Sequence, residues 1–200
     1  MIDSSKYVAI DCEMVGLGPN GFESGLARCS IVDYSGNVIY DKFIKPDGKI
    51  TDFRTPVSGI RPLDMDTALP YPIAREEVST NFIQILKIIQ GKIIVGHDPR
   101  SDFRVLKTDI SNYAIRDTSS CKLLIMKARL KTDRRASLKS LCQNLLGKRI
   151  QDSHKGHSSV EDASAAMELF KLVDIMWEMH LREGRKVEIV NRFENRNRYQ

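Results

Sequence analysis

YVAIDCEMVG, residues 7–16, is a stretch in which apolar side chains alternate with a second set that includes two acids, Asp11 and Glu13. The alternation predicts a buried β-strand whose two faces carry Val8, Ile10, Cys12 and Met14 on one side and Tyr7, Ala9, Asp11 and Glu13 on the other. Asp11 and Glu13 then share a face, about 7 Å apart along the strand. Two carboxylates on a core strand repel each other and lose hydration, and a divalent cation would relieve both costs.

The composition fits one compact domain. The chain has 200 residues, 42% of them hydrophobic, with a formal net charge of +5 and a pI of about 9.0. This basic balance is compatible with a polyanionic partner, but an ordinary basic protein would show it equally well. Beyond Leu181 the chain turns polar, so we assign residues 1–182 to the domain and residues 183–200 to a basic C-terminal tail.

The four cysteines are scattered and form no C-x-x-C pair, which predicts reduced, buried thiols rather than a zinc site. The sequence shows neither a signal peptide ahead of Tyr7 nor an apolar run long enough for a membrane span. We therefore expect no membrane association, a monomer, and a location in the nucleus (including the nucleolus), the cytoplasm or both.

The first half of the chain predicts an α/β fold. Strands at 27–33 and 38–44 flank a turn containing Gly36 and Asn37, which is typical of a hairpin. A long loop follows over 45–72, and apolar residues at three- and four-residue spacing predict a helix over 73–90. The continuous apolar run at 92–96 is the pattern of a central strand buried on both faces, so the helix before it is a crossover.

Two later helices bring further acids. Asp98 and Pro99 resemble an N-cap and first helical residue, with Asp102 one turn inside that helix. A strand at 114–118 and helices at 121–130 and 137–146 come next. Ser158 and Glu161 form a capping-box pattern that starts a last helix, with His157 just before it and Asp162 just over one turn inside.

Five residues are candidates for one site: Asp11, Glu13, Asp102, His157 and Asp162. In an α/β layer the carboxyl end of a central strand lies beside helix amino ends, where these residues would meet. Four carboxylates favour Mg²⁺ or Mn²⁺, and two such ions support displacement at phosphorus, with His157 as the base for the attacking water. For a lone acid in a first helical turn, such as Asp102 or Asp162, complementing the helix dipole is the commoner role.

Four strings give the chain a family resemblance: AIDCEMVGLGP, GLARCSIVD, VGHDPRSDFRVL and GHSSVEDASAAMEL. They are similar to the DEDD-type 3′–5′ exonucleases with an active-site histidine. Within these, the chain resembles the subgroup of the interferon-stimulated 20-kDa exonuclease, the apoptosis-enhancing nuclease and RNA exonuclease 4. The similarity runs over about residues 6–180, and all five candidate residues match the family pattern.

The resemblance implies a ribonuclease-H-like (DnaQ-like) mixed five-stranded sheet flanked by helices. It also implies two divalent cations, Mg²⁺ or Mn²⁺, held by Asp11, Glu13, Asp102 and Asp162. The expected reaction removes 5′-monophosphates from the 3′ end of single-stranded RNA, and of single-stranded DNA as a second substrate. By the same resemblance, Met14 would pack on the terminal nucleotide and Arg54 would reach its sugar or phosphate.

Two other functions stay open at this point. A noncatalytic RNA-binding module would share the basic surface, but it would be expected to lack at least one of the five residues. A metal-dependent endonuclease on the same fold would share the carboxylates, with less need of the loop that carries His157.

Overall fold

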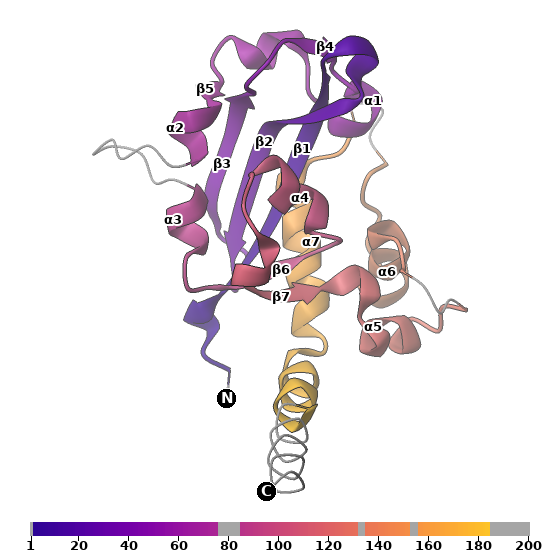
Figure 1. Ribbon diagram of the computed structural model, residues 1–200. Helices are drawn as coiled ribbons and strands as arrows, with labels where there is room; N and C mark the ends of the chain where they lie inside the picture. The colour runs from indigo at the N-terminus through magenta and orange to yellow at the C-terminus, as the bar shows by residue number, and fades with distance from the viewer. Residues whose placement is uncertain (1, 76–84, 132–134, 153–155, 185–200) are drawn as a thin grey trace, which may run out of the picture.

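A mixed β-sheet runs through the protein in the order β5-β3-β2-β1-β6-β7, with β4 paired to β1 outside this path (Figure 1). The computed structural model describes residues 2–75, 85–131, 135–152 and 156–184. The strands of these ranges are β1 (Tyr7–Leu17), β2 (Glu23–Asp33), β3 (Val38–Lys45), β4 (Ile50–Asp52), β5 (Leu69–Pro70), β6 (Ile93–Gly96) and β7 (Ala114–Asp117).

Helices cover both faces of this sheet (Figure 1). They are α1 (Thr55–Ser58), α2 (Tyr71–Arg75), α3 (Ile85–Ile89), α4 (Arg100–Val105), α5 (Lys122–Lys127), α6 (Leu138–Leu145) and α7 (Ser159–Lys171). Residues 174–184 are also helical. None of the helices in the described ranges combines the length and the apolar character that crossing a membrane requires.

The predicted α/β, ribonuclease-H-like architecture is confirmed. β1, β2 and β3 form an antiparallel meander, and β6 and β7 continue the sheet parallel to β1. These five strands are the predicted ones. β4 and β5, of three and two residues, add short pairings within the segment 45–72, which the sequence indicated to be a loop.

β1 is packed on both faces. Val8 and Ile10 belong to the apolar cluster that contains Ile89 of α3 and Phe103 of α4. Tyr7 and Ala9 face α7, where the rings of Tyr7 and Phe170 lie 5.1 Å apart between centroids. Ala163, Met167 and Phe170 form the buried stripe of α7, and its burial against β1 fixes the position of the helix amino end.

β1 extends well past its parallel neighbour. It pairs with β6 only through Tyr7–Ala9, while its remaining residues continue beyond Gly96. Asp11 and Glu13 therefore lie at the carboxyl edge of the parallel strands, where α/β sheets place their ligands.

Asp98 is not the N-cap of α4, contrary to the sequence-based expectation. Its φ is +58°, in the left-handed region, and the residue precedes the N-cap position. Pro99 takes the N-cap position, and α4 begins at Arg100. Asp98 is used instead in a polar network with Asp117, described below.

Other local predictions had mixed outcomes. Ser158 is the N-cap residue of α7, but its side chain makes no capping hydrogen bond. The predicted helix 73–90 coincides with parts of α2 and α3, and its middle, 76–84, lies outside the described residues. Of the tail at 183–200, only the first two residues are described, so residues 185–200 stay untested. All four cysteines are free and buried, as predicted.

Candidate active site

A cavity of about 280 Å³ opens where β1 passes the end of β6. Its lining includes six of the seven residues predicted from the sequence: Asp11, Glu13, Met14, Arg54, His157 and Asp162. It is completed by Cys12, Val57, Ser58, His97, Leu138 and Gln151. Side chains from β1, α1, α6, α7 and three loops therefore meet here.

Asp102, the seventh predicted residue, lies behind this cavity. It is buried in the first turn of α4 with 5% of its surface exposed. Its charge is, after burial, the strongest influence raising the pKa of Asp11. The acids of β1 and α4 therefore form one electrostatic group, although Asp102 does not line the cavity.

The four carboxyl groups hold their protons more tightly than free carboxyl groups do. Burial, followed by the charges of Asp102 and Asp162, raises the pKa of Asp11 well above its usual range. Burial and then the charge of Asp162 raise the pKa of Glu13 to about 8. Burial also raises the pKa of Asp102 and of Asp162. This is the behaviour expected of carboxylates crowded into a low-dielectric site.

Within the described residues, two buried carboxylate oxygens have no hydrogen-bond partner: Oε1 of Glu13 and Oδ1 of Asp162. Leaving such an acceptor unpaired is costly, and in native proteins it calls for an explanation such as an ion. Oxygen donors of this type suit Mg²⁺ and Mn²⁺. The residues present therefore fit a hard divalent cation by their chemistry.

The carboxylates are not arranged as a finished coordination shell. Within the described parts of the chain, no group of three or more His, Cys, Asp or Glu side chains is placed to hold one ion. The fit to a cation therefore rests on the orphan oxygens and on the raised pKa values.

His157 is held at the mouth of the cavity by its backbone. Its N–H donates to the carbonyl of Val57 in α1 at 2.8 Å, and its Nδ1 lies 3.7 Å from Oδ2 of Asp162. Its side chain is 35% exposed. The imidazole can therefore exchange protons with solvent while it faces the acids.

Gly156 makes this placement possible. Its φ is +90°, and a Cβ there would lie 2.3 Å from N of Gly59 and 2.5 Å from the carbonyl of Thr55. Both the backbone conformation and the close approach require glycine. The loop that carries His157 therefore sits directly on the backbone around α1.

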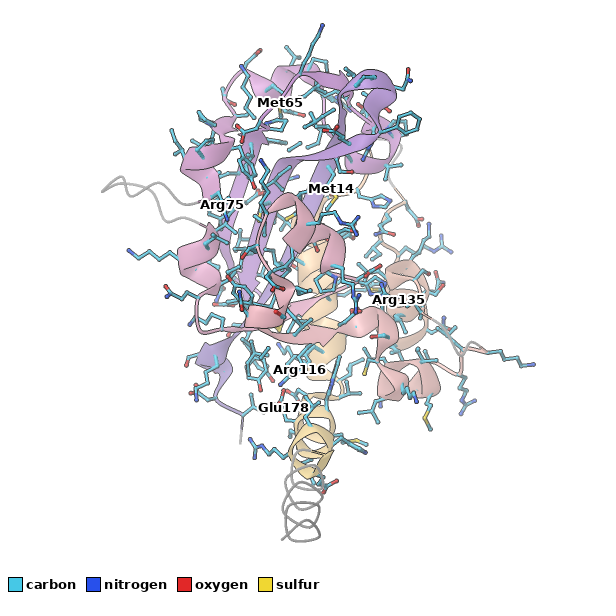
Figure 2. All side chains as sticks on the ribbon, in the orientation of Figure 1. Met14, Met65, Arg75, Arg116, Arg135 and Glu178 are labelled. Carbon is cyan, nitrogen blue, oxygen red and sulfur yellow. The ribbon has the colours of Figure 1, made fainter. Side chains whose placement is uncertain are left out.

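Arg54 lies in the cavity wall, but its guanidinium is already engaged. It donates to the carbonyl of Gly21 at 2.7 Å and to Oγ of Ser24 at 3.0 Å, which ties α1 to the start of β2. Met14, labelled in Figure 2, is partly buried and packs against the core on the side of α4. Their predicted contacts with a nucleotide stay predictions.

Gln151 was missed in the sequence analysis. Its side-chain amide donates to Oδ2 of Asp162 at 2.8 Å. No local pattern identifies it, because it lies in a loop and eleven residues from its partner.

A chain of polar side chains, also missed, supports the amino end of α7; Ser30 and Ser159 in it are buried, and Arg28 and Asp41 are partly buried. Oγ of Ser159 lies 2.7 Å from Oγ of Ser30, which donates to Asp41; Arg28 donates to the same carboxylate through two nitrogens. Arg28 and Ser30 are the cross-strand partners of Glu13 and Asp11. The charge of Arg28 opposes the rise in the pKa of Glu13.

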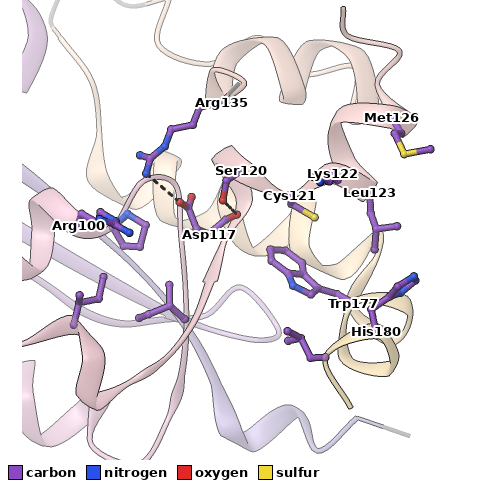
Figure 3. Close-up of a pocket in the computed structure, with 14 residues that line it drawn as sticks. Arg100, Asp117, Ser120, Cys121, Lys122, Leu123, Met126, Arg135, Trp177 and His180 are labelled. Atoms are coloured by element: carbon purple, nitrogen blue, oxygen red, sulfur yellow. Dashed lines mark hydrogen bonds and ion pairs between the residues drawn. The ribbon is translucent and has the colours of Figure 1, made fainter. Parts of the chain in front are cut away.

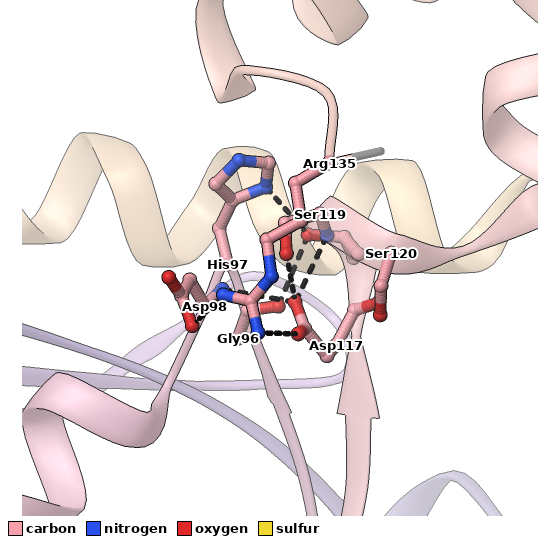
Figure 4. A network of polar contacts seen from close by, with 8 residues as sticks. Gly96, His97, Asp98, Asp117, Ser119, Ser120 and Arg135 are labelled. Atoms are coloured by element: carbon pink, nitrogen blue, oxygen red, sulfur yellow. Dashed lines mark hydrogen bonds and ion pairs between the residues drawn. The ribbon is translucent and has the colours of Figure 1, made fainter. Parts of the chain in front are cut away.

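His97 lines the cavity and also takes part in a local polar network, shown in Figure 4. Its Nδ1 lies 2.9 Å from Oγ1 of Thr118. Next to it, the Asp98 N–H donates to Asp117, and Arg135 pairs with both Asp98 and Asp117. This network joins the ends of β6 and β7 beside the cavity.

Comparison with known proteins gives the same family as the motifs. The Exonuclease (RNase_T) family model matches residues 8–170. Apoptosis-enhancing nuclease of Rattus norvegicus is 50% identical over 177 residues, which are 88% of this chain and 51% of that protein. Interferon-stimulated 20 kDa exonuclease-like 2 of Bos taurus is 52% identical over 179 residues, which are 90% of this chain and 49% of that protein. RNA exonuclease 4 of Xenopus laevis is 41% identical over 178 residues, which are 89% of this chain and 39% of that protein.

A solved structure supports the fold. The Saccharomyces cerevisiae Pan2 pseudoubiquitin hydrolase–RNA exonuclease module, in complex with A7 RNA, is similar with a TM-score of 0.67 and 29% identity. The match covers 92% of this chain and 30% of the Pan2 chain. This chain spans about half or less of the length of the curated relatives named above. The chain belongs to the Exonuclease (RNase_T) family, among its DEDDh-type members.

Proposed function

We propose that this chain is a 3′–5′ exonuclease that hydrolyses single-stranded RNA, and also single-stranded DNA, to 5′-monophosphates. The observation that carries the proposal is the pair of orphan oxygens, Glu13 Oε1 and Asp162 Oδ1, buried beside His157. Both oxygens lack a hydrogen-bond partner. The pKa of every carboxyl group in this site is raised, so each anion is less stable than in a free carboxyl group.

Asp11, Glu13, Asp102 and Asp162 would hold two divalent cations, Mg²⁺ or Mn²⁺. When bound, the cations would neutralise the carboxylates and stabilise negative charge on the phosphate. His157 acts as the general base toward the attacking water, since its imidazole is near solvent and beside Asp162. Gln151 holds Oδ2 of Asp162, which leaves Oδ1 without a partner and free to bind a cation.

RNA is the proposed substrate because the names of a relative and of structural neighbours point to it, and because the chain is basic. Met14 would contact the terminal nucleotide from the cavity wall. Arg54 would approach its sugar or phosphate only by giving up contacts with Gly21 and Ser24. We further propose a monomer that acts in the nucleus, including the nucleolus, or in the cytoplasm.

Digestion of 5′-labelled single-stranded RNA tests the proposal. With Mg²⁺ or Mn²⁺ we expect a descending ladder of products, which EDTA abolishes. Asp11→Asn should lose activity by at least about a hundredfold, because it removes one anionic oxygen from the site. Asp66→Asn is the matched control, since Asp66 is exposed and lies in a loop away from the cavity.

Other results would point elsewhere. One internal cut would show an endonuclease, and binding without cleavage would show an RNA-binding module. Full activity of Asp11→Asn, or activity in EDTA, would refute the proposed site. Parallel digestion of DNA of the same sequence measures the preference between the two polymers.

A further inference from the structure

A second, larger cavity lies against β7, the edge strand of the sheet (Figure 3). Its volume is about 980 Å³, at the upper end of the range for ligand sites. It is bounded by the start of α4, by β7, by α5 and by the helical segment 174–184. The proposed hydrolysis makes no use of it.

The lining of this cavity combines apolar and basic side chains. Trp177, Leu123, Ile115 and Met126 supply apolar surface, and Met126 is 74% exposed. The basic side chains are Arg100, Lys122, Arg135 and His180, all exposed.

Among the described residues of the lining, Asp117 is the only acid, and it is already engaged. Its Oδ1 accepts from the backbone of Asp98 at 2.9 Å and from Oγ of Ser119 at 2.7 Å. Within the described residues, Arg100 and Lys122 have no acidic partner. The cavity therefore presents unpaired positive charge around an aromatic and aliphatic surface, which is the combination that binds single-stranded nucleic acid.

The two cavities share a wall. His97 lines the smaller one and contacts Thr118, while the neighbouring Asp98 contacts Asp117 of the larger one (Figure 4). Arg135 spans this wall by pairing with both aspartates. A polymer with its end in the smaller cavity would need to cross only this short network to reach the larger one.

We propose that the larger cavity binds an upstream nucleotide of the single-stranded substrate, with a base against Trp177 and backbone phosphates at Lys122 and Arg100. This inference rests on the proposed exonuclease function. It predicts that substrates too short to reach Trp177 lose this affinity, whereas longer ones gain it. Stacking on an aromatic residue changes the affinity by on the order of fivefold or more per base.

Fluorescence provides a direct test, because Trp177 is the only tryptophan of the chain. Asp11→Asn protein, which should not degrade RNA, is titrated with oligouridylates of 2 and of 12 nucleotides. We expect the 12-mer to quench Trp177 and the dimer to leave its fluorescence unchanged. Absence of quenching by the 12-mer, or equal quenching by both, would overturn the proposal.

A charge variant tests the phosphate contacts in the active protein. Lys122→Ala should raise KM for the 12-mer by about threefold or more and flatten its dependence on salt, with the dimer unaffected. Lys127→Ala is the matched control, since Lys127 is exposed on the same helix but does not line the cavity. Identical kinetics of the two variants would contradict the proposal. The apolar surface would then be better explained as a binding site for a protein partner. Loss of the hydrolysis ladder in the wild type would instead refute the exonuclease function.

Discussion

The amide of Gln151 and the carboxylate of Asp162 are joined by a 2.8 Å hydrogen bond that uses only one of the two carboxylate oxygens. That oxygen, Oδ2, also lies 3.7 Å from Nδ1 of His157, whereas Oδ1 is buried without a partner. Gln151 therefore engages the oxygen of Asp162 that faces the histidine and leaves the other oxygen without a partner.

Replacing Gln151 by Leu should weaken cation binding. The pKa of Asp162 is raised by burial, and the hydrogen bond from Gln151 opposes that rise. Without it the carboxylate forms less readily, so the Mn²⁺ concentration for half-maximal activity should increase by about 10- to 100-fold. Titration of activity with Mn²⁺ at pH 7 measures this. Gln143→Leu, on the exposed part of α6, should behave as wild type, and an unchanged Mn²⁺ requirement in Gln151→Leu would refute the role.

Gly156→Ala should displace the loop of His157. The new Cβ would lie 2.3 Å from N of Gly59, so backbone must move. We expect kcat to fall at least about tenfold, because catalytic groups tolerate little misplacement, with little change in Mn²⁺ affinity. Gly36→Ala is a close control: its φ of +94° imposes the same backbone strain, but nothing lies within 4 Å of its Cβ. If both variants keep wild-type kcat, the close approach does not position the histidine.

Glu13 should make the cation-free protein less stable as the pH rises. Burial and the charge of Asp162 raise its pKa from 4.5 to about 8. Between these values the folded protein retains a proton that the unfolded chain has released, so the free energy of unfolding decreases as the pH rises from about 4.5 to 8. The decrease from this group is at most about 5 kcal/mol.

Thermal unfolding in EDTA across this pH range measures the effect. Glu13→Gln should flatten the profile, and Glu23→Gln, at an exposed residue, should not. Added Mn²⁺ should raise Tm more at pH 8 than at pH 6, because cations bind the ionised carboxylates. The reverse order would contradict the assignment.

The ion pair between Arg116 and Glu178 should stabilise the attachment of the helical segment 174–184 to β7. The two side chains lie together below the sheet in Figure 2, buried and joined by hydrogen bonds of 2.6 and 2.9 Å. Glu178→Ala leaves the arginine buried without its partner, which should cost about 3–5 kcal/mol in urea unfolding.

Two further variants separate charge from packing at this pair. Arg116→Met combined with Glu178→Leu should recover most of the loss, because no unpaired charge then remains. Glu183→Ala, at an exposed position of the same segment, should change stability little. A loss below about 1 kcal/mol for Glu178→Ala would show that the pair is not important for stability.

The parts of the structure that sequence reasoning predicted are those with a repeating pattern. The alternation in β1 and the apolar stripe of α7 each reflect burial on a regular element, so both the strand and the helix could be predicted. Asp11, Glu13, His157 and Asp162 lie on or beside these two elements, and Asp102 lies in the first turn of α4, so they could be placed together.

Other features depend on contacts that leave no periodic signal. The left-handed backbone of Asp98 is set by its bonding to Asp117, and the side chain of Arg54 is drawn to Gly21 and Ser24. Gln151 lies outside the regular elements and contacts Asp162 of α7 through a single side-chain hydrogen bond. Such contacts join irregular segments, and neither composition nor spacing could have identified them.

Because Gly156 packs directly on α1, the site has two parts that differ in how easily they open: the acids of β1 and the loop residue His157. The acids of β1 belong to the sheet and can be exposed only by opening the core, whereas His157 is attached to α1 mainly through one backbone hydrogen bond. Hydrogen exchange at the His157 amide should therefore be faster than at the β1 amides. Brief loss of this contact would interrupt proton transfer to His157 while the acids of β1 stay in place, so the rate of the proposed hydrolysis would depend on the fraction of time that His157 is docked on α1.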